Sequence, residues 1–287
     1  MNRTIFEIGV MTETGTGEGN PFDAAARHGV HVTQLCNWNM KLCNSAFAKK
    51  IRKQIRDCNI RLNSVWTGYS GKVVWNFVDG PVTIGLVPPD LREQRVADLI
   101  RNAEFAAECG APAIATHCGF LPESPRDALY SGSLDAIGRV AARCRELGME
   151  FWFETGQETP TTLLRTIEDL KMDNLGVNFD TANLILYGKA NSVDAVRVLG
   201  SYIRNVHVKD GLYPVSGTEL GMEVPLGKGL ARYTELLPAL YRAGYRGDLI
   251  IEREITGEQQ LKDIQKAIVY LKKRIAGTLA AAQKRKK

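Results

Sequence analysis

The chain has 287 residues, of which 44% are hydrophobic and 24% are charged. This balance is typical of a globular protein and excludes a disordered chain. No stretch reaches the roughly 18 consecutive apolar residues of a membrane span. The N-terminal residues show no secretory or transit pattern, and the six cysteines include no C-x-x-C pair. We therefore expect a cytoplasmic protein with reduced thiols and no membrane partner.

The formal net charge of +5 is unevenly distributed along the chain. Residues 272–287 contain seven basic side chains and no acidic one, so residues 1–271 carry a net charge of −2. A nearly neutral body does not favour a nucleic-acid partner. We expect residues 276–287 to form a disordered, solubilising basic tail, with attraction to nucleic acid or an anionic membrane as the alternative.

Short β-branched segments alternate with longer segments of helical period. The predicted strands are residues 5–10, 31–38, 61–66, 112–117, 149–154, 176–180, 205–209 and 249–252. The predicted helices are residues 44–58, 91–109, 124–147, a segment that begins at Thr159-Pro160, 191–199, 231–243 and 257–275. Glycines follow several of these helices, as in βα units. The pattern predicts an α/β fold with one domain over residues 1–275, a (β/α)₈ TIM barrel.

One predicted loop is unusually long. Residues 67–89 join the third strand to the next helix and include Trp75 and Phe77. Loops of this length in compact domains commonly have a function. In a barrel the loop lies on the carboxyl-terminal face, so it either covers the site as a lid or packs on the barrel through its aromatic residues.

Ionisable residues end four consecutive predicted strands. Glu154 ends the fifth strand, Asp180 the sixth, His207 lies near the end of the seventh and Glu252 ends the eighth. Active sites of such barrels lie at this rim. Three converging carboxylates repel one another unless a cation lies between them. Three oxygen ligands and one nitrogen suit a single divalent ion, with Mn²⁺ the first choice and Mg²⁺, Co²⁺ or Zn²⁺ also possible.

Several segments resemble those of the sugar phosphate isomerase/epimerase family, the xylose isomerase-like TIM barrels. They are residues 153–158, 178–183, 207–211 and 251–254, supported by residues 116–120, 225–229 and 244–247. The resemblance implies that Glu154, Asp180, His207 and Glu252 hold one divalent metal. It also implies that Glu154 and Glu252 act as an acid/base pair on a sugar, keto-sugar or sugar phosphate, through an enediolate.

Four further residues are expected to bind this carbohydrate: His117, Asn183, Lys209 and Trp66. Lys209 could stabilise an oxyanion or a phosphate, and His117 could bind a hydroxyl group at the end of the fourth strand. Trp66 could form a wall of the sugar site, as could Trp75. Asn183 stands where the ketose 3-epimerases of the family have a histidine.

A second departure from those epimerases is that no Arg occurs between Arg204 and Arg232. Both departures leave room for another keto-sugar, or for a metal-dependent lyase such as a dehydratase or a 3-oxo-glycoside-cleaving enzyme. The related apurinic endonucleases need a His-rich cluster of several metals, which four histidines with two at the rim do not supply. A non-catalytic barrel would have a broken ligand set. By resemblance, we expect a homo-oligomer, a dimer or a tetramer.

Overall fold

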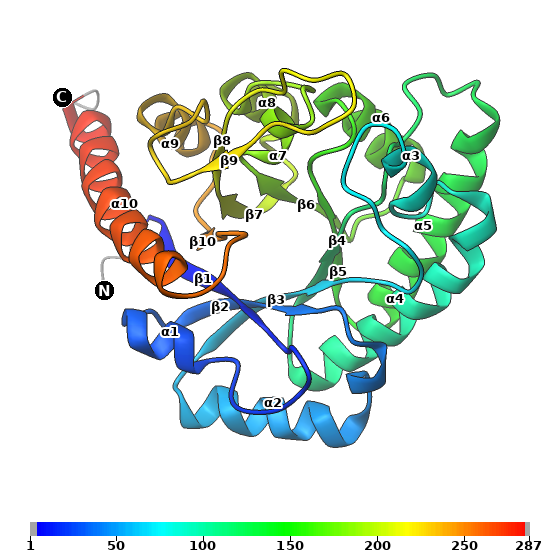
Figure 1. Cartoon of the computed structure of the whole chain (residues 1–287), viewed down its shortest axis with the longest axis horizontal. Coiled ribbons are helices and arrows are strands. Elements are labelled where there is room, and N and C mark those ends of the chain that lie inside the picture. Colours follow the sequence, from blue (N-terminus) through cyan, green and yellow to red (C-terminus); the bar gives the residue numbers. More distant parts are fainter. Residues whose placement is uncertain (1–4, 285–287) are drawn as a thin grey trace.

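The computed structural model describes residues 5–284, with side chains to residue 282. Eight parallel strands close into a barrel in the order β1-β10-β7-β6-β5-β4-β3-β2. Helices surround this barrel (Figure 1). The predicted (β/α)₈ TIM barrel is thus confirmed, and every predicted strand segment overlaps one barrel strand.

The barrel strands are β1 (Glu7–Glu13), β2 (Val32–Asn37), β3 (Arg61–Thr67), β4 (Ala113–Thr116), β5 (Glu150–Glu154), β6 (Leu175–Asp180), β7 (Ile203–Val208) and β10 (Asp248–Ile251). The sequence did not predict the two-residue strands β8 (Asp210–Gly211) and β9 (Glu223–Val224), which pair antiparallel outside the barrel. They order the segment that follows β7.

The helices are α1 (Asp23–His28), η1 (Met40–Leu42), α2 (Ser45–Asp57), α3 (Gly80–Thr83), α4 (Pro89–Cys109), α5 (Ala128–Glu146), α6 (Pro160–Leu170), α7 (Asn183–Leu186), α8 (Ser192–Leu199), α9 (Tyr233–Arg242) and α10 (Glu258–Lys284). Among the described residues, no helix is long and apolar enough to cross a membrane. The short elements α1, η1, α3 and α7 were not predicted, because a single turn carries too little periodic signal.

Side-chain caps fix where several helices begin. Thr159 accepts a hydrogen bond from the backbone of Thr162 and begins α6, as predicted. The predicted start of α5 at Ser124 is wrong. The Ser124 hydroxyl accepts from the Arg126 backbone N–H and caps a separate turn, whereas Asp127 accepts from the Leu129 backbone N–H and begins the helix. Ser and Asp are both good cap residues, so residue type alone does not distinguish the two positions.

The prediction of a disordered tail from residue 276 is also wrong, because α10 continues to Lys284. Ile275 and Thr278 are buried and Leu279 packs on the hydrophobic core. Alanine recurs through this last segment and has the highest helix propensity. Burial and propensity therefore extend the helix beyond its predicted end. Residues 285–287, the rest of the predicted basic tail, lie outside the described residues.

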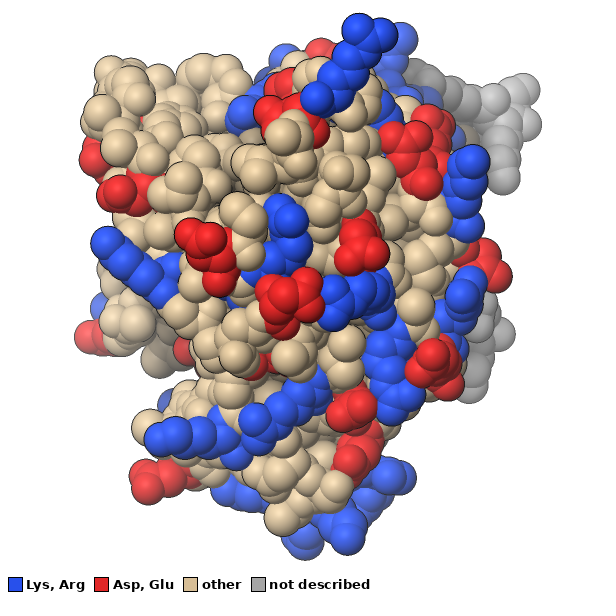
Figure 2. Space-filling view, turned by 90° about the vertical axis from the view of Figure 1, so that its right-hand side faces the viewer, with Lys and Arg blue, Asp and Glu red and all other residues tan. Residues whose placement is uncertain are grey.

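Charges of both signs are mixed on the face shown in Figure 2, the side of the molecule at the right of Figure 1. Ion pairs join α4 and α5: Arg139 of α5 pairs with Glu93 of α4, and Arg143 pairs with Glu104. This face presents no extended patch of one sign.

Arg95 of α4 holds the long loop of residues 67–89 against the barrel. Its side chain is fully buried, and its guanidinium carbon lies 4.4 Å from the centre of the Tyr69 ring. The guanidinium donates hydrogen bonds to loop carbonyls at distances of 2.7 to 3.2 Å, those of Ser70, Lys72, Thr83 and Gly85. The loop is therefore packed and anchored, with α3 inside it.

We predict that Arg95→Met destabilises the protein by about 2–4 kcal/mol, because several buried carbonyls lose their donors. Urea unfolding measures this loss, and limited proteolysis between residues 67 and 89 reports release of the loop. Arg139→Met is the control, since its ion pair is exposed and contributes little. Equal stability and equal cleavage of the two variants would contradict the anchoring role of Arg95.

Candidate metal centre

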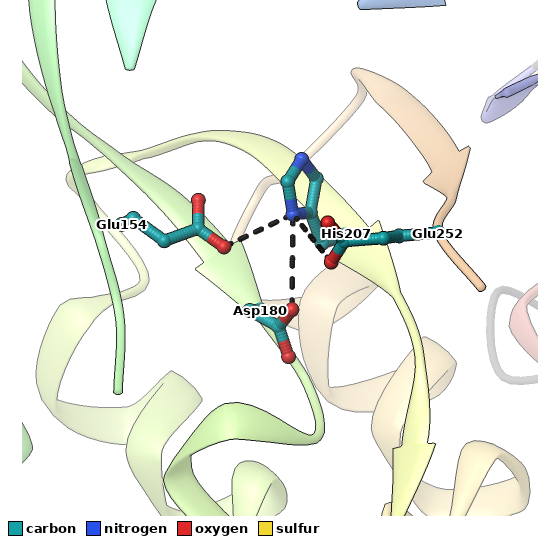
Figure 3. Close-up of side chains that lie close together, drawn as sticks. All are labelled: Glu154, Asp180, His207 and Glu252. Atoms are coloured by element: carbon teal, nitrogen blue, oxygen red, sulfur yellow. Dashed lines mark ion pairs between the residues drawn. The ribbon is translucent and has the colours of Figure 1, made fainter. Parts of the chain in front are cut away.

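The side chains that end four barrel strands meet at one point. Glu154, Asp180 and His207 come from β5, β6 and β7, and Glu252 follows β10 directly. One ligand atom from each residue lies within 4.8 Å of the others. Figure 3 shows Glu154 and Glu252 directed at the imidazole from opposite sides. The structure thus brings together all four residues that the sequence predicted as metal ligands.

Two buried atoms in this cluster lack hydrogen bonds. His207 Nδ1 lies 3.0 Å from Glu154 Oε1, 3.3 Å from Glu252 Oε2 and 3.7 Å from Asp180 Oδ2, yet it makes no well-aligned hydrogen bond. Asp180 Oδ2 also accepts no well-aligned hydrogen bond in the described structure, although Lys209 Nζ lies 3.2 Å from it. Buried polar atoms are rarely left in this way. Converging carboxylate oxygens and an imidazole nitrogen are a donor set that fits one divalent cation.

Gln34 of β2 contacts the other nitrogen of the His207 ring, Nε2. Its Oε1 contacts His207 Nε2, while its Nε2 donates to Ser64 Oγ at 2.8 Å and to Asn178 Oδ1 at 3.2 Å. Because the amide nitrogen already donates to two acceptors, Oε1 accepts a hydrogen bond from the Nε2–H of His207. The imidazole therefore carries hydrogen on Nε2, and Nδ1 is the nitrogen available to a metal.

Further amides extend this network below the cluster. Asn178 donates to Glu154 Oε2 and accepts from Asn205 Nδ2 at 2.5 Å. In the opposite direction Ser64 donates to Asn63, and Asn63 donates to Asp248 Oδ2 at 2.7 Å. Asp248 accepts two hydrogen bonds from Arg61 at the amino-terminal end of the barrel.

Gln34, Asn178 and Asn205 were not predicted as functional residues. Each is an amide residue within a barrel strand, and each is fully buried. The amides within the strands were the available signal for a network inside the barrel.

Lys209 is a buried counter-charge for the carboxylates. Its Nζ lies 2.7 Å from Glu254 Oε1, 2.9 Å from Glu252 Oε2 and 3.2 Å from Asp180 Oδ2. Burial would lower the pKa of Lys209, but Asp180 and Glu252 raise it well above its usual value. Three carboxylates thus face the three donors of this ammonium group. Its predicted contact with substrate stays a prediction.

Burial and neighbouring charges give Glu154 and Glu252 different pKa values. Burial raises the pKa of Glu154 to about 7, and His207 only partly offsets this. Burial would also raise the pKa of Glu252, but Lys209 and His207 outweigh it and hold that pKa well below its usual range. Burial would lower the pKa of His207, which Glu154 and Glu252 instead raise well above its usual value. The two carboxyl groups therefore differ in proton affinity.

A cavity of about 300 Å³ opens above the cluster. Trp66, His117 and Asn183, which the sequence predicted to bind substrate, line it, whereas Lys209 does not. Burial, and after it repulsion from Lys209, lowers the pKa of His117 to about 3, so its imidazole is neutral at pH 7. The cavity is also lined by Met11, Glu13, Cys36, Trp38, Trp75, Glu154, Leu186, Tyr187, Leu220, Glu252 and Glu254.

Comparison with known proteins identifies the family of this chain. Residues 22–274 match the family model described as a xylose isomerase-like TIM barrel. A xylose isomerase domain protein from Planctomyces limnophilus is 34% identical, with a TM-score of 0.90 over 96% of this chain and 99% of that chain. A structure of L-ribulose 3-epimerase is 17% identical, with a TM-score of 0.74 and 97% of each chain covered, which shows a shared fold.

An inosose dehydratase of Lacticaseibacillus casei is 27% identical over 137 residues, which are 41% of this chain and 45% of that protein. The chain spans about half the length of the curated relatives it matches. The family model, by contrast, covers most of the barrel, from α1 into α10. This chain belongs to the xylose isomerase-like TIM barrel family.

Proposed function

We propose that the protein is a metal-dependent isomerase or epimerase that acts on a sugar or keto-sugar. The observation that carries this proposal is the buried cluster of Glu154, Asp180, His207 and Glu252 beneath an aromatic-walled cavity. Family membership supports it, since L-ribulose 3-epimerase shares the fold.

The four residues would hold one divalent cation. Three carboxylates favour the harder ions, so Mn²⁺ is our first choice, with Mg²⁺, Co²⁺ and Zn²⁺ as alternatives. When bound, the cation draws electron density from substrate oxygens and stabilises the negative charge of an enediolate. Gln34 keeps His207 Nδ1 directed at this position, and Lys209 balances part of the carboxylate charge.

Glu154 and Glu252 are the proposed acid/base pair. They approach the centre from opposite sides (Figure 3). Glu252 has the more ionised carboxyl group, which suits the base that removes a proton from the carbon next to a carbonyl. Glu154, whose pKa is near 7, suits the acid that returns a proton to the other face. His117 and Asn183 would orient hydroxyl groups at the cavity wall.

A lyase is the second candidate, favoured by the similarity to inosose dehydratase. The same base would remove the same proton, and a group on the neighbouring carbon would leave in place of a returning proton. The product formula separates the two reactions: an isomerase leaves it unchanged, whereas a lyase releases water or an alcohol.

We predict that metal-loaded protein incorporates deuterium from D₂O at the carbon next to the carbonyl in a panel of keto-sugars. Mass spectrometry of the recovered sugars measures this exchange. Glu154→Gln and Glu252→Gln should each lower it by about 10²–10⁴-fold, the usual contribution of a general acid or base. Glu150→Gln, at the opposite end of β5, is the matched control. Full activity in both active-site variants would exclude the two-glutamate mechanism.

Metal binding should release protons. Nearby carboxylates raise the pKa of His207 well above its usual value, and burial raises the pKa of Glu154 to about 7. Both groups bind metal only in their deprotonated forms. We expect the binding of Mn²⁺ to release about one to two protons and its affinity to rise as the pH increases from 6 to 8. Calorimetry in buffers of different ionisation enthalpy counts these protons. Binding without proton release, and with no pH dependence, would contradict this protonation scheme.

Gln34→Leu should weaken Mn²⁺ binding about 10–100-fold, because His207 loses the partner that fixes its tautomer. Thr33→Val, in the same strand, is the control, since the buried Thr33 hydroxyl has no hydrogen-bond partner. Titration calorimetry gives the dissociation constant, and thermal unfolding confirms that both variants are folded. The role of Gln34 is refuted if both variants bind Mn²⁺ equally well.

A further inference from the structure

Three tryptophans form a continuous aromatic wall from the depth of the cavity to its mouth. Trp66 of β3 is only 5% exposed, whereas Trp38 and Trp75 are 42% and 41% exposed. The ring centres of Trp38 and Trp66 lie 5.3 Å apart, and those of Trp38 and Trp75 lie 6.4 Å apart. A sugar bound beside the proposed acid/base residues would contact the inner end of this wall, at Trp66. The proposed function gives no role to the outer end, Trp38 and Trp75.

The fold holds Trp38 in place. Its indole lies against Gly68, where an added Cβ would come within 2.1 Å of the ring. Only glycine therefore allows this position, and the Tyr69 ring contacts the indole edge at a centre distance of 5.8 Å. A ring seated in this way keeps its orientation before any ligand binds.

The long loop holds Trp75. Arg95 anchors that loop on one side, and the Phe77 backbone N–H donates to the Thr218 carbonyl at 2.9 Å on the other. The Trp75 ring also contacts His117, with a centre distance of 5.3 Å. Both exposed tryptophans are thus pre-organised, which reduces the entropy that a ligand must lose on binding.

The chemistry of the wall limits the occupant. Indole faces bind flat, apolar surfaces, such as aromatic rings and the C–H faces of sugars. Among the described residues that line the cavity none is Lys or Arg, so no side chain there pairs with a phosphate. Of the four carboxylates that line it, Glu154 and Glu252 would face the proposed cation, Glu254 pairs with Lys209, and Glu13 is left to face the occupant. This lining favours a neutral occupant with hydroxyl donors over a phosphate.

We propose that Trp38 and Trp75 form an outer subsite for a second ring, so that the substrate is a neutral oxo-glycoside rather than a single sugar or a sugar phosphate. Its first ring carries the carbonyl group that the proposed proton transfer needs. The first ring lies at Glu154 and Glu252, and the aglycone ring stacks on the outer subsite. This inference rests on the proposed function for the position of the first ring. Its test depends on binding alone.

The test measures binding to the Mn²⁺-loaded Glu252→Gln variant, which avoids turnover. The probes are the methyl and phenyl glycosides of glucose, galactose, mannose and xylose in both anomeric forms, and the 6-phosphates of the three hexoses. We expect at least one phenyl glycoside to bind about tenfold more tightly than its methyl counterpart, the gain expected from aromatic stacking. The phosphates should bind more weakly than the parent sugars.

Adding Trp38→Ala or Trp75→Ala should remove this phenyl preference. Val82→Ala, an exposed residue of the same loop that does not line the cavity, should keep it. The proposal is overturned if no phenyl glycoside in the panel outperforms its methyl partner, or if the preference survives in both tryptophan variants. A phenyl preference without deuterium exchange would refute the proposed function alone. Exchange with keto-sugars without the preference would refute the outer subsite alone.

Discussion

The structure depends on the close approach of three carboxylates within one small cluster, of which Glu154 and Asp180 are buried and Glu252 is partly exposed. Glu154, Asp180 and Glu252 surround His207 at the end of the barrel, where little water can screen them. Like charges this close cannot all be ionised without nearby positive charge. Lys209 supplies part of it from below, and the geometry fits a divalent cation for the rest. The network around Gln34, the position of Lys209 and the cavity above all follow from this requirement.

Because the clustered carboxylates need hydrogen-bond donors, the barrel interior is not filled with branched apolar side chains in the usual way. Amides from β2, β6 and β7 hydrogen-bond to each other and to the cluster, while most of the apolar core lies between the strands and the helices. Gln34 and Asn178 each use both the amide nitrogen and the amide oxygen in hydrogen bonds, whereas Asn205 uses its amide nitrogen. A polar interior of this kind stabilises only when its members are satisfied, and in return it orients the ligands.

The sequence predicted the fold and the four clustered residues because both depend on local patterns. Glu154 and Asp180 come at the ends of apolar strands, and parallel strands bring such ends to one rim. Lys209 shows what local patterns do not predict. Its position in the chain suggested a substrate contact, but its side chain points toward Asp180, Glu252 and Glu254. Only the closed barrel brings these three carboxylates near it. Trp38 was missed for the same reason, since its seat on Gly68 joins two loops. The predicted end of α10 was wrong because the basic residues suggested an exposed tail, whereas Ile275 and Thr278 are buried.

In most barrels of this kind the amino-terminal face serves stability and is free to change independently of the chemistry at the other face. Here Arg61 and Asp248 lie at that face but connect through Asn63, Ser64 and Gln34 to His207. Substitutions at this pair therefore disturb one end of a directional chain whose other end is the proposed metal ligand His207. Substitutions at the amino-terminal end of the barrel therefore affect the carboxyl-terminal end. Relatives with another residue at the position of Asp248 must orient the histidine by other means.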